Sequence, residues 1–295
     1  MRKYIGEIGL IITAIIWGSG FVASAVSLEH YTPYQILAGR FLIGVLILCV
    51  LFYKKLKDIK KSTLIKGTIL GLFLYVAFVL QTVGLQYTTP SKNAFLTAVN
   101  VVIVPFIGFL LYKRKIDMFE LVGAVMALVG IAVLSLQLSA EVNIGDLLTL
   151  FCAVGFAFHI FYTSRFVKDE DAVLLTIVQM AVATALAWIA VLFRGETTFT
   201  LESEGLLPLV YLGVFSTTIA YLLQTVAQKF ITETKAAIIL STEALWGTAF
   251  SIIILSEVLT TKMIIGAMLI LVAIIISETK FSFVKKKEIE EITGP

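Results

Sequence analysis

Polar side chains inside long apolar runs are the residues of this chain that could carry chemistry. Glu243 lies in the run 235–256, and Asn100 lies in the run 92–112. Burying a carboxylate in hydrocarbon costs free energy unless the carboxylate binds a cation or a proton. We therefore expect Glu243 to bind a cationic group of a small-molecule substrate or a coupling proton, unless a structural pairing with Arg40 or a hydroxyl accounts for it.

Six more side chains within the apolar runs are candidates for contact with a substrate: Trp17, Arg40, Gln81, His159, Gln224 and Trp246. Arg40 could bind an anionic carboxylate or act as a structural counter-ion. His159 could relay protons or hydrogen-bond a neighbouring helix, and the two glutamines could contact substrate or join helices. The tryptophans lie away from the interfaces where this residue usually anchors, so they form either a cavity wall or part of the packing.

The sequence contains few residues that could form an enzyme active site. The two histidines, His30 and His159, and the two cysteines, Cys49 and Cys152, form no metal-ligand cluster, and no acids pair inside the apolar runs at catalytic spacing. No Walker-type loop that would hold the phosphates of ATP is present. We therefore expect no enzymatic activity, no cofactor, no bound metal and no nucleic-acid partner.

The composition indicates that lipid faces most of the surface. Apolar residues make up 59% of the 295 residues, charged residues make up 15%, and the mean hydropathy is +0.99. A soluble domain carries about 25% charged residues, so these charges could not cover a soluble surface. The apolar runs are continuous rather than alternating, and each is long enough for a helix to cross about 30 Å of hydrocarbon. They predict an all-α membrane protein with ten transmembrane helices at 5–28, 33–53, 64–87, 92–112, 119–137, 145–165, 172–193, 206–228, 235–256 and 262–279.

The positive charges predict how these helices are oriented. If the N-terminus is cytoplasmic, nineteen of the 23 Lys and Arg residues lie on the cytoplasmic side and three, Lys92, Arg194 and Lys262, lie outside. Cytoplasmic loops are enriched in Lys and Arg, so we expect a multi-pass protein of the cell membrane with both termini in the cytoplasm. The first run is interpreted as a span rather than a cleaved signal peptide, because Trp17-Gly18-Ser19-Gly20 interrupts it.

The sequence repeats itself at an offset of 143 residues. Gln81-Thr82-Val83 recurs as Gln224-Thr225-Val226, and Gly123-Ala124 recurs as Gly266-Ala267. The same offset relates Asn100 to Glu243. The predicted helices also begin and end at matching places in the two copies, which strengthens a repeat that identities alone only suggest.

Each copy of the repeat holds five predicted helices, and this odd number turns the second copy upside down in the membrane. We expect one five-helix repeat in residues 1–137, an inverted repeat in 145–280 and a cytoplasmic tail in 281–295. Two inverted halves can exchange conformations, and this exchange gives alternating access to a site near the middle of the bilayer. The repeat therefore predicts a polar site around Asn100 and Glu243.

The chain resembles EamA-type permeases of the drug/metabolite transporter superfamily over essentially its full length. Four segments carry the resemblance: Ile16-Trp17-Gly18-Ser19-Gly20-Phe21-Val22, Gly39-Arg40-Phe41-Leu42, Leu240-Ser241-Thr242-Glu243-Ala244 and Ile254-Leu255-Ser256-Glu257-Val258-Leu259. The chain departs from the family pattern at Ala244, where Pro is usual. It also departs at Ala98-Val99-Asn100, where a Thr-Pro stretch is usual, and Pro105 is displaced. The resemblance implies ten helices, a central cavity and transport of amino acids, metabolites or drugs.

These observations favour a secondary transporter of small metabolites, namely amino acids, related metabolites or amphipathic drugs, that works by alternating access. A polytopic membrane enzyme and a channel are the alternatives. A channel would need a filter-like loop of carbonyls or a ring of charges, and neither pattern is visible in the sequence. The partners expected are the substrate and membrane lipid, with a proton at Glu243 as one candidate for the coupling ion, while the cargo, direction, coupling ion and oligomeric state stay open.

Overall fold

Long apolar helices dominate the architecture. The computed structural model describes residues 2–113, 118–135, 143–200 and 202–279, and all regular structure within these ranges is helical. A helix satisfies its own backbone hydrogen bonds, which a chain surrounded by hydrocarbon requires. Eight helices of the described ranges are long and apolar enough to cross a membrane, and two shorter apolar stretches cover Leu121–Val133 and Thr261–Ile276. The predicted tail 281–295 lies outside the described residues.

The helices follow the predicted runs to within about three residues at each end. Those of the first half are α1 (Arg2–Ser27), α2 (Pro33–Leu51), the 3₁₀ segment η1 (Tyr53–Asp58), α3 (Lys61–Leu85), α4 (Pro90–Ala98), α5 (Asn100–Tyr112) and α6 (Met118–Ser135). Those of the second half are α7 (Ile144–Phe166), α8 (Ala172–Arg194), α9 (Ser203–Tyr211), the π-helical segment η2 (Leu212–Ile219), α10 (Ala220–Gln228), α11 (Glu233–Ser241), α12 (Glu243–Leu255) and α13 (Thr261–Thr279).

Two of the predicted helices are interrupted near their middle, where the sequence alone had indicated continuous runs. The first splits into α4 and α5 at Val99, and the second splits into α11 and α12 at Thr242. At both points the backbone N–H bonds to the carbonyl three residues earlier, at 3.3 and 3.2 Å, which tightens the turn. Asn100 and Glu243 thereby become the first residues of the second segments.

A third irregularity widens the helix that runs from α9 through η2 to α10. Pro208 has no N–H to donate within α9, and the π-helical turns begin a few residues later. In η2 the hydroxyl of Thr218 bonds to the carbonyl of Gly213, five residues earlier, at 2.7 Å. Such wide turns often accompany functional sites, and this one holds Ser216 and Thr217 on the interior of the bundle.

The interrupted helices of the two halves have the same bounds when shifted by 143 residues. α4 and α11 are each 9 residues long, and α5 and α12 are each 13 residues long. Thr89 and Thr232 cap the first segments by accepting a hydrogen bond from the backbone three residues on. Lys113 and Ser256 end the second segments with the same left-handed φ of 54°. The two stretches are therefore built alike down to their caps.

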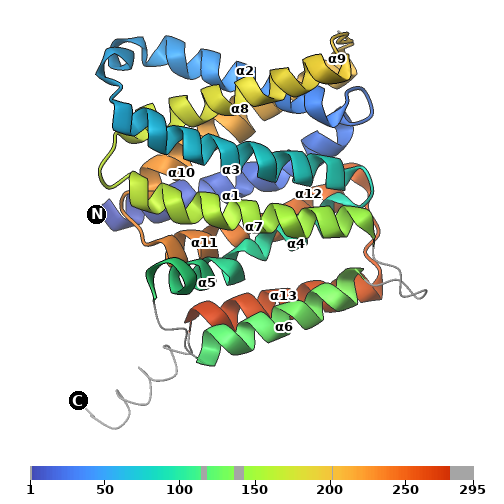
Figure 1. Ribbon diagram of the computed structural model, residues 1–295. Coiled ribbons are helices and arrows are strands. Elements are labelled where there is room, and N and C mark those ends of the chain that lie inside the picture. The colour runs from blue at the N-terminus through green and yellow to red at the C-terminus, as the bar shows by residue number, and fades with distance from the viewer. Residues whose placement is uncertain (1, 114–117, 136–142, 201, 280–295) are drawn as a thin grey trace.

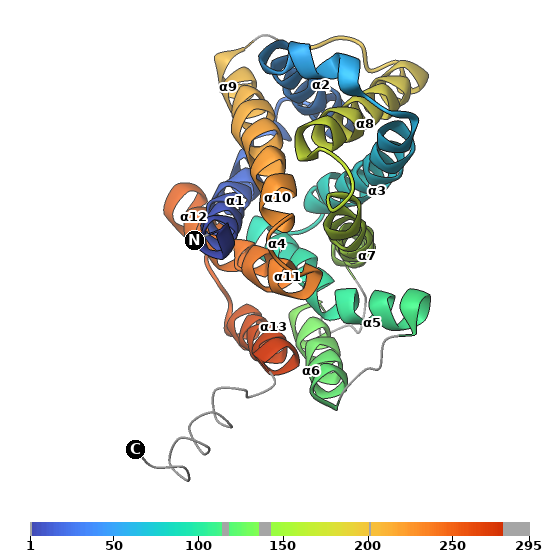
Figure 2. The same ribbon diagram turned by 90° about the vertical axis from the view of Figure 1, so that its left-hand side faces the viewer.

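The helices form a bundle in which α4 and α11 lie centrally, α12 lies at the outside against α1, and α6 pairs with α13 at one edge (Figures 1 and 2). α4–α5 and α11–α12 run in opposite directions, so α12 packs on α4 and α11 packs on α5. Large apolar side chains such as Phe193, Leu110 and Ile253 point outward and are exposed. This exposure suits a lipid environment, in which outward apolar groups carry no penalty.

Small residues let α3 approach α8 closely, as the spacing of Gly67 and Gly71 suggests. A Cβ on Gly71 would lie 2.7 Å from Cβ of Val182 and 2.8 Å from the backbone oxygen of Gln179. We expect Gly71→Val to lower the free energy of unfolding by about 2 kcal/mol, because backbone atoms cannot move aside cheaply. Thermal unfolding in detergent measures this change. Leu72→Val, at an exposed position one residue along α3, is the control, and equal stability of the two variants would contradict the packing role.

Candidate functional site

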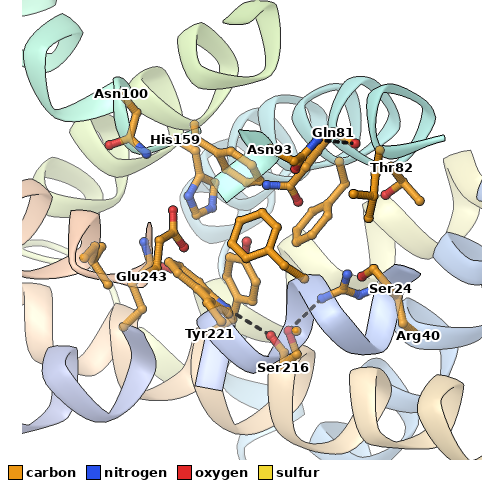
Figure 3. A pocket seen from close by; sticks show the side chains of 18 of the residues that line it. Ser24, Arg40, Gln81, Thr82, Asn93, Asn100, His159, Ser216, Tyr221 and Glu243 are labelled. Atoms are coloured by element: carbon orange, nitrogen blue, oxygen red, sulfur yellow. Dashed lines mark hydrogen bonds between the residues drawn. The ribbon is translucent and has the colours of Figure 1, made fainter. Parts of the chain in front are cut away.

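A cavity with about 600 Å³ of space between atoms, open solvent included, lies among the helices of the bundle (Figure 3). Its wall is formed by α1, α2, α3, α4, α5, α7, η2, α10, α11 and α12. Seven of the eight predicted site residues line it: Trp17, Arg40, Gln81, Asn100, His159, Gln224 and Glu243. The structure therefore brings together side chains that lie up to 226 positions apart in the sequence.

Glu243 and Asn100 lie on the wall of this cavity at the starts of α12 and α5. Both are buried, with 5% and 3% of the residue exposed. No hydrogen bond or ion pair joins the Glu243 carboxylate to another side chain among the described residues, and Asn100 Oδ1 has no partner there either. The positive end of the α12 dipole favours a carboxylate at this position. The carboxylate is thus placed without a counter-ion beside an open space.

Arg40 does not pair with Glu243, so the structural pairing considered from the sequence is not found. Its Nε donates to Thr217 Oγ1 at 2.8 Å, and a terminal nitrogen donates to Ser216 Oγ at 3.1 Å. The guanidinium also lies 4.3 Å from the centre of the Phe78 ring. In Figure 3 Arg40 and Glu243 occupy opposite sides of the cavity. The cavity therefore has a cationic side and an anionic side.

Aromatic rings form the wall between these two sides. Trp17 Nε1 donates to the backbone oxygen of Ser216 at 3.1 Å, and its ring centre lies 4.9 Å from that of Tyr221. Tyr221 is buried and also contacts the rings of Phe78 and His159, at 6.0 and 5.8 Å. Trp17 therefore takes the cavity-wall role that was one of its two expected roles. Such a surface suits a flat apolar group of a ligand.

The remaining predicted polar residues have different surroundings. His159 Nε2 lies 2.7 Å from Gln179 Oε1, whereas its Nδ1 has no partner among the described residues. Gln81 donates to Thr97 Oγ1 at 3.1 Å and so joins α3 to α4. Gln224, related to Gln81 by the 143-residue offset, is fully buried, and both of its amide atoms lack a partner within the described ranges. Gln81 thus lines the cavity and also joins two helices, whereas the Gln224 amide makes no such bond among the described residues.

Trp246 is the predicted site residue that the structure does not bring to the cavity. It is 38% exposed, and its Cβ faces Gly18 across the contact between α1 and α12. The close contact of α12 with α1 at Gly18 takes up this side of the helix, so the side chain does not line the cavity. Its packing role was the other alternative considered from the sequence.

Sequence reasoning missed several lining residues, among them Phe78, Asn93, Ser216 and Tyr221. Ser216 belongs to Ser216-Thr217-Thr218, three hydroxyl residues in the middle of an apolar run, and this pattern could have indicated an interior face. Asn93 donates to Thr149 Oγ1 at 2.9 Å and to the backbone oxygen of Gln81 at 3.2 Å. Nothing in the sequence separates Phe78 from the other 20 phenylalanines.

The cavity is displaced toward one end of the bundle. Its lining reaches Ser24 and Leu85, which lie in the last turns of α1 and α3. At the opposite end the lining stops at Gln224, a turn before α10 ends. Beyond it, Gln228 Nε2 donates to the backbone oxygen of Ile160 at 3.1 Å and to Ser164 Oγ at 2.8 Å. These two hydrogen bonds join α10 to α7 below the cavity.

Comparison with known proteins agrees with this architecture. A model described as the EamA-like transporter family matches residues 4–136 and 143–279. An uncharacterized transporter of Archaeoglobus fulgidus is 33% identical over 278 residues, which cover 94% of this chain and 86% of the relative. The uncharacterized inner membrane transporter YedA of Escherichia coli K12 is 28% identical over 228 residues, or 74% of each chain. A solved structure titled only as the crystal structure of a protein shares the fold with a TM-score of 0.68 at 16% identity, and the match covers 94% of this chain and 98% of the other.

The two matched ranges leave out only the first residues, a short linker and the C-terminal end, and the A. fulgidus relative matches over nearly the same length. Membrane transport agrees with the apolar helices, with the buried polar cavity and with the names of these relatives. The chain belongs to the EamA-like transporter family and is a multi-pass membrane transporter.

Proposed function

We propose that this protein is a secondary transporter that carries small metabolites across the cell membrane by alternating access. Amino acids, related metabolites and amphipathic drugs are the cargo classes. The observation that carries the proposal is the central cavity, whose wall holds a carboxylate without a counter-ion, a guanidinium and a surface of aromatic rings.

Ten spans in two inverted halves are part of this proposal. The helices α6 and α13 contain 18 and 19 residues, and a helix of this length reaches about 27 to 29 Å. Counting both as spans gives five helices per half, with the boundaries 1–137 and 145–280. The matching bounds of α4–α5 and α11–α12 and their opposite directions support the inversion. The uneven distribution of Lys and Arg supports cytoplasmic termini.

Closure of one end of the cavity by hydrogen bonds supports alternating access. The residues that join α10 to α7 are Gln228, Ile160 and Ser164. The 143-residue offset relates Gln228 to Leu85 and Ser164 to Phe21, and the latter two line the cavity. At one end of the bundle Gln228 and Ser164 thus form a polar contact. At the other end their repeat-related positions, Leu85 and Phe21, are apolar and border the cavity. The opposite state would exchange these arrangements.

We expect Gln228→Leu to loosen the closed end. Removing the two hydrogen bonds takes away the polar contact between α10 and α7, and this loss raises the population of open states about tenfold. Hydrogen–deuterium exchange of the backbone in α10 and the end of α7 measures the opening. Gln86→Leu, an exposed amide at the end of α3, is the matched control. Exchange as slow in Gln228→Leu as in the control would exclude a closing role for these bonds.

Transport by the purified protein is the test of the proposed function. The protein is reconstituted in lipid vesicles, and uptake of radiolabelled amino acids, amines and an amphipathic dye is followed with and without a proton gradient. Saturable uptake that requires the protein, at rates far below those of a channel, is the expected result. Rates that do not saturate would indicate a channel, and chemical conversion of the solute would indicate a membrane enzyme.

The coupling ion is expected to be a proton that binds at Glu243. A proton and a cationic substrate would compete for the same carboxylate, so each would leave when the other arrives. Within the described residues no group of three or more His, Cys, Asp or Glu side chains is arranged to hold a metal ion. No particular observation within the described ranges favours the enzyme or the channel over the transporter.

A further inference from the structure

The anionic side of the cavity is rich in hydrogen-bond acceptors that have no donor. It is formed by Glu243, Asn100 and His159, which lie together on one side of Figure 3, and we call these residues the acceptor site. Each of the three is at least nine-tenths buried. Asn100 Oδ1 and His159 Nδ1 lack a hydrogen-bond partner among the described residues. Buried acceptors left unpaired cost free energy, so a site of this kind is completed by a ligand.

The imidazole of His159 is held as an acceptor. Its Nε2 lies 2.7 Å from Gln179 Oε1, and an amide oxygen can only accept a hydrogen bond. With Gln179 Oε1 facing the ring, Nε2 carries the proton and donates it, which leaves Nδ1 of the neutral ring with a lone pair. Gln179 is itself fully buried. The side of the ring without a partner is thus the accepting side.

The acceptor site contains one carboxyl group, that of Glu243. Arg40, the cation of the cavity, lies at the other side and is engaged with Thr217, Ser216 and the Phe78 ring. The other titratable groups facing the cavity are His159 and Tyr221, and neither is an anion at neutral pH. The site therefore combines a single carboxylate with two neutral acceptors.

We infer that the acceptor site binds a primary ammonium group, so that the transporter selects solutes carrying –NH₃⁺. An ammonium has three N–H donors and one positive charge, which matches three acceptors and one carboxylate. A quaternary ammonium would satisfy the charge but leave the acceptors of Asn100 and His159 unpaired. The Trp17 and Tyr221 rings beside the site would cover the apolar body of the solute. This inference rests on the proposed transport function and names the group that the cavity recognises.

Binding to the purified full-length protein in detergent tests the inference directly. The probes are 2-phenylethylamine, its N,N,N-trimethyl derivative and 2-phenylethanol, which share one aromatic body and differ in the polar group. We expect the primary amine to bind at least tenfold more tightly than either of the other two in titration calorimetry. Equal or tighter binding of the trimethyl derivative would overturn the inference, because that ligand cannot donate a hydrogen bond.

Phenylalanine distinguishes the two kinds of solute that carry this group. A free amine offers the ammonium alone, whereas an amino acid adds a carboxylate that Arg40 could attract. Both carry –NH₃⁺, so both are expected to bind more tightly than 3-phenylpropionate, which lacks it. Tighter binding of phenylalanine than of the amine would identify amino acids as the source, and the reverse would identify free amines. Preference for 3-phenylpropionate over both would overturn the inference.

Two variants test whether a change in ligand affinity comes from the acceptor site or from a change in the stability of the fold. Asn100→Leu removes a buried amide oxygen that has no partner among the described residues, so we expect thermal stability to be retained or raised while affinity for 2-phenylethylamine falls about tenfold. Glu243→Gln keeps the shape and is expected to lower that affinity further. Gln86→Leu and Glu233→Gln make the same changes outside the cavity and are expected to bind like the parent. Unchanged affinity in both cavity variants would exclude the acceptor site.

The same compounds in vesicles separate this inference from the proposed function. Uptake of solutes irrespective of an ammonium group would leave the transport function standing and overturn the ammonium site. Selective binding of the amine without uptake of any solute would support the ammonium site and overturn the transport function.

Discussion

Replacing Asp146 with alanine is expected to lower the free energy of unfolding by about 3 kcal/mol. Asp146 is completely buried at the start of α7, where its carboxylate lies 2.6 Å from Lys92 Nζ at the start of α4. Thr88 Oγ1 donates to the same carboxylate at 2.6 Å. Alanine leaves a largely buried ammonium without an anion, and the cost of that uncompensated charge dominates the loss. Denaturant unfolding in detergent, followed by tryptophan fluorescence, measures it.

The ion pair of Lys235 with Glu7 is the natural control. Lys235 and Lys92 are related by the 143-residue offset, and both lie in the first turn of a helix that precedes an interruption. The side chains of Lys235 and Glu7 are 39% and 22% exposed, so water already screens the pair. Lys235→Ala is expected to cost about 1 kcal/mol or less. Equal losses from Asp146→Ala and Lys235→Ala would contradict the argument from burial.

A double variant isolates the unpaired charge as the cause. Lys92→Met combined with Asp146→Ala removes both charges and keeps most of the apolar contact of the lysine stem. We expect this chain to recover at least half of the stability that Asp146→Ala alone loses. A double variant that is less stable than Asp146→Ala would show that the pair acts through packing instead of charge.

Glu243→Gln is expected to reduce transport of a cationic substrate at least about tenfold at low substrate concentration. A charge-assisted hydrogen bond is worth about 1.5–3 kcal/mol, and 1.4 kcal/mol corresponds to a factor of ten. The glutamine keeps the shape of the side chain and removes its charge, so the fold is expected to persist. Initial uptake rates in vesicles over a range of substrate concentrations measure the change.

The pH dependence of the uptake rates shows whether the charge of Glu243 or the shape of its side chain is responsible for the effect. In the parent protein, protons compete with the cation for the carboxylate, so uptake is expected to fall as pH falls. The variant has no carboxylate at this position, and its residual uptake is expected to vary little with pH. Glu233→Gln, outside the cavity in the first turn of α11, keeps the parent behaviour. Uptake by Glu243→Gln equal to that of the parent at every pH would exclude a role for this residue.

The surroundings of the candidate residues show where sequence reasoning was sufficient. Asn100 and Glu243 are related by the internal repeat, and both were predicted near one central site; both line the cavity. A polar group within an apolar helix avoids lipid, so its presence alone implies an interior position. The same rule succeeded for Arg40 and His159. It failed to predict their partners, because Thr217 and Gln179 are no more prominent in the sequence than many other polar residues.

The two tryptophans show what could not be predicted from the sequence, namely which side chains of an apolar helix face the cavity. Trp17 and Trp246 both lie deep in apolar runs, yet Trp17 lines the cavity and Trp246 is 38% exposed on the outside. A soluble helix shows its buried face by the alternation of apolar and polar residues. A membrane helix is apolar on both faces, because lipid and protein interior are alike in polarity. Phe78 and Tyr221 could not be assigned to the cavity for the same reason.

The sequence by itself therefore determined the helices, their bounds to within about three residues, the repeat and the polar residues that must avoid lipid. These features depend on local composition and backbone hydrogen bonding, which each segment satisfies alone. Only the tertiary structure decided where α4–α5 and α11–α12 are interrupted, which rings line the cavity and where α10 bonds to α7. Those features depend on how helices of similar polarity pack together, and packing is decided by the shapes of side chains distant in the sequence.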